Sequence, residues 1–173
     1  MRSVDKSIVI SQLTASGATK NGFLNRTLAS TTHFHTFTIE DETTLFSLIW
    51  HYHKATQLLT PGTWIGGKVY TVGDVAKYML DHQITFQALA SGSLPGTYTP
   101  NWFESCVNIY ENFNEATFNA LVVQLPNNTE RKDCPNGTFR IIDGTHRTLV
   151  LSYLLLQKKR AFKPISCILA ITK

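Results

Sequence analysis

One stretch near the C-terminal end decides the fold of this chain: Thr138-Phe139-Arg140-Ile141-Ile142-Asp143-Gly144-Thr145-His146-Arg147-Thr148. Residues 138–142 predict a strand, because β-branched and aromatic side chains dominate them. Residues 146–160 carry a nearly continuous apolar run and predict a largely buried helix. Residues 165–171 predict the final strand. Strand, helix and strand in this order form a β-α-β unit, in which a crossover of this length implies parallel, adjacent strands.

The turn between the first strand and the helix collects groups that suit an anion. A helix N-terminus presents N–H groups and the positive end of the helix dipole. Glycine lets a ligand approach the backbone, hydroxyls and imidazole donate hydrogen bonds, and a guanidinium suits phosphate. These groups predict a nucleotide-binding site made of Gly144, Thr145, His146, Arg147 and Thr148. The same segment also fits a plain turn in which Asp143 or Thr145 caps the helix.

Phe139 to Arg147, followed by an apolar helix, resembles the ParB/sulfiredoxin superfamily. Its members show a hydrophobic strand, a Gly-x-x-Arg or Asp-Gly-x-His-Arg turn and then a helix. An upstream helix over residues 101–116 and a strand ending near Leu125 are similar too, so the resemblance covers roughly residues 101–173. It implies a ParB/sulfiredoxin-like mixed sheet with a nucleotide-phosphate site at the turn.

Two branches of that superfamily fit poorly. Sulfiredoxins place their catalytic cysteine just before the His-Arg pair, where this chain has Thr145. Partition proteins usually carry Glu-Arg-Arg at the turn, whereas this chain has Thr145-His146-Arg147 with no basic DNA-binding helix after it. The resemblance therefore implies a stand-alone member, similar to plasmid or phage accessory proteins that combine ATPase and nuclease activity.

The resulting hypothesis is binding of ATP or another nucleotide, with phosphoryl transfer or hydrolysis and, in its fullest form, coupling to DNA cleavage. Arg147 is expected to neutralise charge on the transferred phosphoryl group. His146 is expected to act as general acid or base, and Asp143 to bind Mg²⁺. Glu104, Glu111 and Glu115 are further candidates for a base, and the sequence selects none of them.

Two alternatives belong to other classes of protein. One is a catalytically inactive ParB-like fold that inhibits a protein partner. The other is a DNA-binding regulator, because residues 70–79 resemble the opening helix of MerR-type helix-turn-helix domains. Residues 81–90 lack the Arg and Lys that a recognition helix uses, which disfavours the regulator.

The remaining chain predicts a mostly helical N-terminal part, residues 1–95, packed on a core of residues 96–173. Ser, Gly and Pro in residues 90–96 mark the boundary. Helices are expected over residues 38–59 and 71–82, the second capped by Thr71 and Asp74. Further expectations are an edge strand at Ile8-Val9-Ile10 within otherwise loop-like residues 1–32, a hairpin over residues 64–70, a strand at residues 120–125 and a polar loop over residues 126–137.

Composition sets outer limits on these hypotheses. The 173 residues are 43% hydrophobic and 16% charged, which suits one compact domain or one with a small attachment. The net charge of +4 is compatible with an anionic ligand or nucleic acid. Three cysteines without a C-x-x-C spacing exclude a disulfide framework and a cysteine zinc site. No signal peptide or membrane-length apolar run is visible, so the expected location is cytoplasmic, with no membrane partner.

Overall fold

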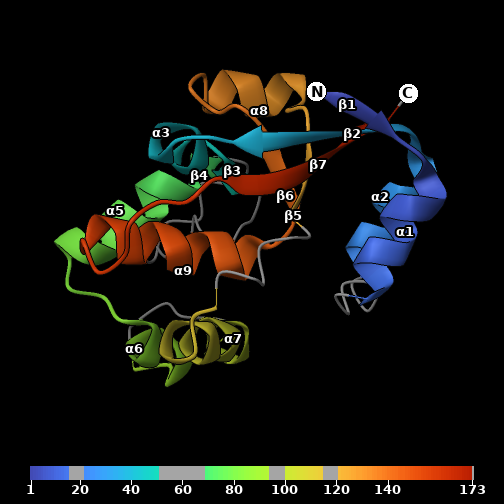
Figure 1. Ribbon diagram of the computed structural model, residues 1–173. Coiled ribbons are helices and arrows are strands. Elements are labelled where there is room, and N and C mark those ends of the chain that lie inside the picture. Colours follow the sequence, from blue (N-terminus) through green and yellow to red (C-terminus); the bar gives the residue numbers. More distant parts are fainter. Residues whose placement is uncertain (16–21, 51–68, 94–99, 115–120, 173) are drawn as a thin grey trace.

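A mixed sheet runs through the residues that the computed structural model describes, which are 1–15, 22–50, 69–93, 100–114 and 121–172 (Figure 1). Its seven strands lie in the order β1-β2-β7-β5-β6-β3-β4. The strands are β1 (Arg2–Val4), β2 (Thr31–Ile39), β3 (Ile49–Trp50), β4 (Tyr70–Thr71), β5 (Leu121–Gln124), β6 (Arg140–Asp143) and β7 (Ile165–Thr172). The helices are α1 (Lys6–Ala15), α2 (Gly22–Ser30), α3 (Glu42–Phe46), α5 (Val72–Asp81), α6 (Phe86–Ala90), α7 (Pro100–Glu111), α8 (Asn128–Asp133) and α9 (Thr145–Leu156). The predicted mixed α/β class is confirmed.

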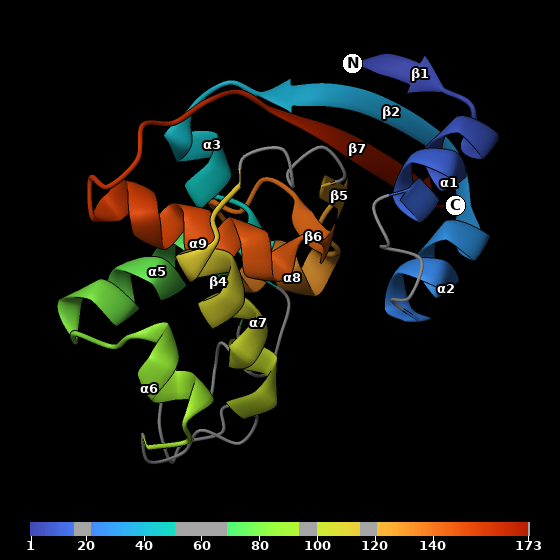
Figure 2. The same ribbon diagram turned by 60° about the horizontal axis from the view of Figure 1, so that its bottom comes forward.

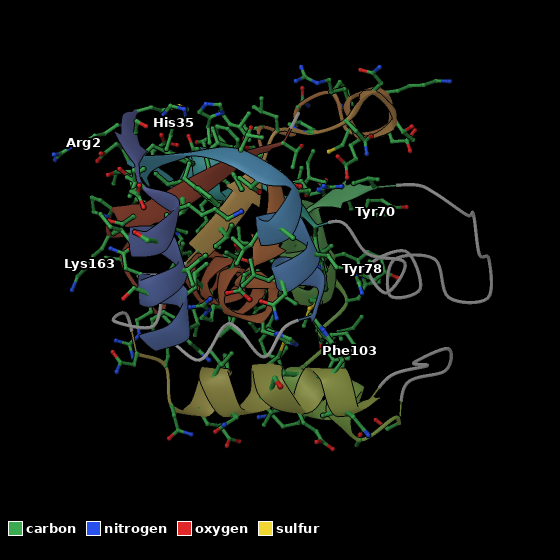
Figure 3. All side chains as sticks on the ribbon, turned by 90° about the vertical axis from the view of Figure 1, so that its right-hand side faces the viewer. Arg2, His35, Tyr70, Tyr78, Phe103 and Lys163 are labelled. Atoms are coloured by element: carbon green, nitrogen blue, oxygen red, sulfur yellow. The ribbon has the colours of Figure 1, made fainter. Side chains whose placement is uncertain are left out.

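Helices cover both faces of the sheet. On one face α9 packs beside α5, and α7 with α6 lies beyond them (Figures 1 and 2). On the other face α1 and α2 lie over β7 and β2 (Figure 3). Side chains alternate between the two faces, as a pleated strand requires. In β5, Leu121 and Val123 join the large core under α9, whereas Val122 joins the smaller core under α1 and α2.

The expected pairing of the strands around α9 is wrong. β5 lies between β6 and β7, antiparallel to β6 and parallel to β7, so β6 and β7 are neither adjacent nor parallel. Asp143 at the end of β6 and Ile168 near the start of β7 both pair with Val122 of β5, so β7 starts at the end of the sheet where β6 stops. Residues 157–164 lead the chain from α9 back to that end of the sheet. β7 also pairs with β2 on its other side, antiparallel and along the whole length of both strands. This second pairing helps to set the direction of β7.

The N-terminal segment is also more regular than predicted. Ile8-Val9-Ile10 belongs to α1, not to an edge strand. Val9 and Leu13, one helical turn apart, are fully buried against the sheet, while Ile8 is 51% exposed. Asp5 helps to begin this helix, because its carboxylate accepts from Ser7 N at 2.7 Å and its carbonyl accepts from Val9 N.

Of the helix predicted over residues 38–59, only Glu42–Phe46 is helical in the described part, and the prediction is wrong for the rest of that part. Thr38 ends up in β2 opposite Ser166, and a short helix, α3, begins only after Asp41. The Asp41 carboxylate accepts from Thr44 N at 2.7 Å and caps that helix. β3 then follows at Ile49, and residues 51–59 lie outside the described chain. Most of the hairpin expected over residues 64–70 lies outside it too, although β3 pairs antiparallel with β4.

Several other elements follow the predictions closely, whereas α2, α6 and α8 were not predicted. Helix α5 has the expected capping box, in which Thr71 Oγ1 accepts from Asp74 N and Asp74 accepts from Thr71 N, both at 3.1 Å. Helices α7 and α9 and strands β5, β6 and β7 lie within a few residues of their predicted bounds. The predicted polar loop instead contains α8, whose capping box pairs Asn127 with the buried Glu130.

The two predicted parts of the chain share one sheet. Residues before 95 contribute β1 to β4, and residues after it contribute β5 to β7. The N-terminal part is thus not purely helical padding, because its strands extend the sheet on both sides of the C-terminal strands. Across the described ranges, no helix combines the length and apolarity needed to cross a membrane.

Candidate functional site

The predicted phosphate turn has the backbone geometry that its glycine implies. β6 ends at Asp143, Gly144 occupies the N-cap position with φ 97° and ψ 11°, and α9 begins at Thr145. This positive φ is strained for residues with a Cβ. Space forbids one as well, because a Cβ at Gly144 would lie 2.6 Å from Leu121 Cδ1. The chain therefore needs glycine here, and a glycine cap adds no side-chain bond to the first N–H groups of the helix.

Asp143 and Arg147 form an ion pair across this turn. Arg147 Nη2 donates to Asp143 Oδ2 at 2.8 Å, and the two side chains are 18% and 15% exposed. Burial lowers the pKa of the Arg147 guanidinium, and the neighbouring Asp143 carboxylate opposes that change. The carboxylate thus fixes a planar cation at the positive end of α9.

His146 lies in a stack of aromatic rings that the sequence did not predict. Its ring packs on Trp102 of α7 with 4.0 Å between centroids and 29° between planes. Trp102 in turn packs on Trp50, the last residue of β3, at 5.4 Å. β3 runs parallel to β6, with Ile49 opposite Arg140, so both strands end toward the same edge. The stack orients the His146 imidazole, and it could not be foreseen because its three rings come from distant segments.

The two threonines of the turn differ in their surroundings. Thr148 is fully buried, and its hydroxyl donates within the helix to the carbonyls of Gly144 and Thr145, both at 3.0 Å. It therefore holds the first turn of α9 together. Thr145 is only partly buried. The structure thus gathers Asp143, Gly144, Thr145, His146 and Arg147 around the turn and places the Thr148 hydroxyl beneath it.

Of the three carboxylates named as an alternative base, the structure describes two, and both lie on α7. Glu104 and Glu111 are exposed on α7, and Glu111 accepts a hydrogen bond from Gln87 Nε2. Glu115 lies outside the described residues.

The donor set does not fit a metal ion held by protein groups alone. In the described ranges, no group of three or more His, Cys, Asp or Glu side chains could hold one. At the turn, Asp143 Oδ2 already accepts from Arg147. Mg²⁺ is commonly held by one or two carboxylates together with substrate phosphates. Magnesium at Asp143 would therefore depend on a bound nucleotide, and it stays a prediction.

Searches of protein-family models, curated proteins and solved structures find no match to this chain. The resemblance of residues 139–147 to the ParB/sulfiredoxin superfamily stays a prediction that rests on the motif. The helix-turn-helix alternative gains nothing from the geometry, because α6 has five residues, no Arg or Lys, and buries Phe86 and Leu89.

Proposed function

We propose that the Asp143–Arg147 turn binds the phosphates of ATP or a related nucleotide and supports phosphoryl transfer or hydrolysis. The observation that carries this proposal is the Arg147 guanidinium, held by Asp143 at 2.8 Å beside the glycine cap of α9. A fixed cation and a helix N-terminus at one turn form a combination that suits phosphate.

Each residue of the turn has a defined part in this proposal. Gly144 supplies the positive φ with which the chain passes from β6 into α9, so that the first N–H groups of the helix lie at the turn. Arg147 and the first N–H groups of α9 offset the charge that develops on the transferred phosphoryl group. Asp143 acts through Arg147 by setting the direction of its guanidinium. Thr145 adds a hydroxyl donor at the partly exposed side of the turn.

His146 is the group that would exchange a proton with the substrate. Histidine titrates near neutral pH, which suits general acid or base catalysis. Stacking on Trp102 limits the rotation of its ring, so a variant without the indole should lose rate more than affinity. DNA is the candidate second substrate, in line with the net charge of +4.

Calorimetric titration with ATP, ADP and CTP tests binding. The wild type is compared with a His146→Ala/Arg147→Ala double variant. Arg160→Ala is the matched control, because Arg160 follows α9 at the end opposite the turn, where it packs on the Phe113 ring at 5.4 Å. Loss of binding in the double variant alone supports the proposal and justifies assays of nucleotide hydrolysis and DNA nicking. Equal affinities in all three proteins would overturn it.

A Trp102→Leu variant tests the role given to His146. We expect the nucleotide affinity to stay within about twofold and the pH profile of hydrolysis to change, because only the orientation of the imidazole is altered. An unchanged profile would assign the stack to packing alone.

A further inference from the structure

A hollow lies away from the turn, at the end of the sheet where β6 begins. It is a pocket of about 580 Å³ between β4, the start of α5 and the chain that follows α8. Figure 3 shows Tyr70 and Tyr78 below α8 on this side of the molecule. The described residues that line it are Ser47, Val69, Tyr70, Thr71, Asp74, Tyr78, Asp133, Cys134, Pro135 and Asn136. The volume falls in the range of small-molecule sites, about 300–1,000 Å³.

Hydrogen bonds hold the walls of this pocket in place. Ser47 Oγ and Thr138 Oγ1 lie 2.8 Å apart, and Thr138 N donates to Ser47 O at 3.1 Å. Gly137 N donates to Cys134 O at 2.9 Å, which fixes the turn through Pro135 and Asn136. On the other wall, the capping box of Thr71 and Asp74 fixes the start of α5. The pocket is therefore formed before any ligand arrives.

The lining is acidic in a chain whose net charge is +4. Among the described residues that line it, Asp74 and Asp133 are acidic and none is a lysine or an arginine. Asp133 makes no hydrogen bond or ion pair to any described residue, and Asp74 uses one oxygen, Oδ2, on Thr71 N. The pKa of the Cys134 thiol is raised, first by burial and then by the negative charges of Asp74 and Asp133. Both carboxylates therefore act on the same thiol. Asp74 of α5 and Asp133 of α8 thus bring negative charge to the same pocket.

The aromatic side chains of the lining determine which cation fits. Tyr70 and Tyr78 bring phenol rings into the wall, and Tyr78 is backed by His82, with 3.9 Å between ring centroids. An ammonium group is attracted both to carboxylates and to the face of an aromatic ring. A bare metal ion is a poorer match, because no metal-binding group of three side chains occurs among the described residues.

We propose that this pocket binds an alkylammonium cation, either a free aliphatic amine or a lysine side chain presented by another protein. Asp133 and Asp74 pair with the ammonium group, and Tyr70 and Tyr78 contact its methylene groups and positive charge. The site is independent of the nucleotide turn, which lies where β6 ends rather than where it begins.

The test is a binding titration of the full chain with three probes. Cadaverine represents a free diamine, Nα-acetyl-lysinamide represents a lysine side chain, and 1,5-pentanediol is the uncharged analogue of cadaverine. We expect at least one amine to bind at millimolar concentration or below, and the diol not to bind. The tighter amine identifies the source of the ligand. Failure of both amines, or equal binding of cadaverine and the diol, would overturn the proposal.

Matched variants locate the binding. Asp133→Asn should weaken amine binding about fivefold, the effect of losing one partly exposed ion pair. Tyr78→Leu should weaken it as well, because the aromatic face is lost. Asp81→Asn changes the charge equally but lies outside the lining, paired with Lys77 at 2.7 Å. If Asp81→Asn weakened binding as much as Asp133→Asn, the attraction would be a general charge effect and the assignment would be wrong.

Discussion

Replacing Gly144 with alanine should destabilise the fold through two separable effects. The first is the backbone, because φ 97° costs an alanine about 1–2 kcal/mol. The second is overpacking, because the new Cβ would lie 2.6 Å from Leu121 Cδ1, in a side chain that is only 1% exposed. Forcing an extra methyl into a packed core costs about 1–3 kcal/mol. The sum predicts a loss of about 2–5 kcal/mol in the free energy of unfolding.

Urea unfolding, followed by tryptophan fluorescence, measures this loss. With a slope of about 2 kcal/mol per molar urea, the midpoint should fall by about 1–2.5 M. Gly92→Ala is the control for the backbone effect alone, because Gly92 also has a positive φ, 69°, but is exposed. It should lose only about 1–2 kcal/mol.

A double variant separates the overpacking. In a Leu121→Ala background the clash is absent, so Gly144→Ala should cost no more than it does at Gly92. A Gly144→Ala protein within about 0.5 kcal/mol of wild type would refute the reasoning, because neither effect would then operate.

Three further predictions concern other parts of the fold. Glu130→Ala should lower the free energy of unfolding by about 2–3 kcal/mol in urea titrations, because it removes both the buried carboxylate 3.2 Å from Arg140 and the capping box of α8, and leaves Arg140 its hydrogen bond to Gln124; a loss below about 0.5 kcal/mol would contradict this. Thr71→Ala should cost about 1 kcal/mol in the same assay through the lost cap of α5, and an unchanged midpoint would count against the capping box. Burial raises the pKa of Cys167 from 9.0 to about 12, so the unfolded thiol ionises first and stability should fall as pH rises from about 9 toward 12. Cys167→Ala should reduce that slope in urea midpoints compared at several pH values, and an identical slope would refute it.

Local signals were enough to predict the elements around the turn. The apolar run of α9 and the capping residues of α5 determine those helices before any tertiary contact is known. Gly144 marked the turn because its neighbours change from strand to helix patterning there. These features depend on residues close together in sequence, which a single sequence shows directly.

The errors came from contacts between distant residues. Nothing in residues 138–171 shows that β5 lies between β6 and β7, so the parallel pairing followed from a general rule that this topology does not obey. Ile8-Val9-Ile10 has strand propensity, yet burial of Val9 with Leu13 favours a helix. The alternating aromatic and β-branched residues of β2 were a usable signal, but residues 33–37 were assigned no element and the helix expected over residues 38–59 included the last two residues of the strand.

The site was predictable only in part for the same reason. The turn residues are contiguous, and the structure keeps them together. The Trp102–His146 contact joins α7 to α9, and no pattern within residues 138–148 indicates it. The buried position of the Thr148 hydroxyl also depends on the helix that forms around it.

The most direct test of the central claim is a map of the backbone amide signals during an ATP titration, by two-dimensional nitrogen–proton NMR. If the turn binds phosphate, the largest shifts should occur at Gly144, Thr145, His146 and Arg147, and the Arg147→Ala protein should lose them. Shifts centred elsewhere, or none at millimolar ATP, would contradict the account.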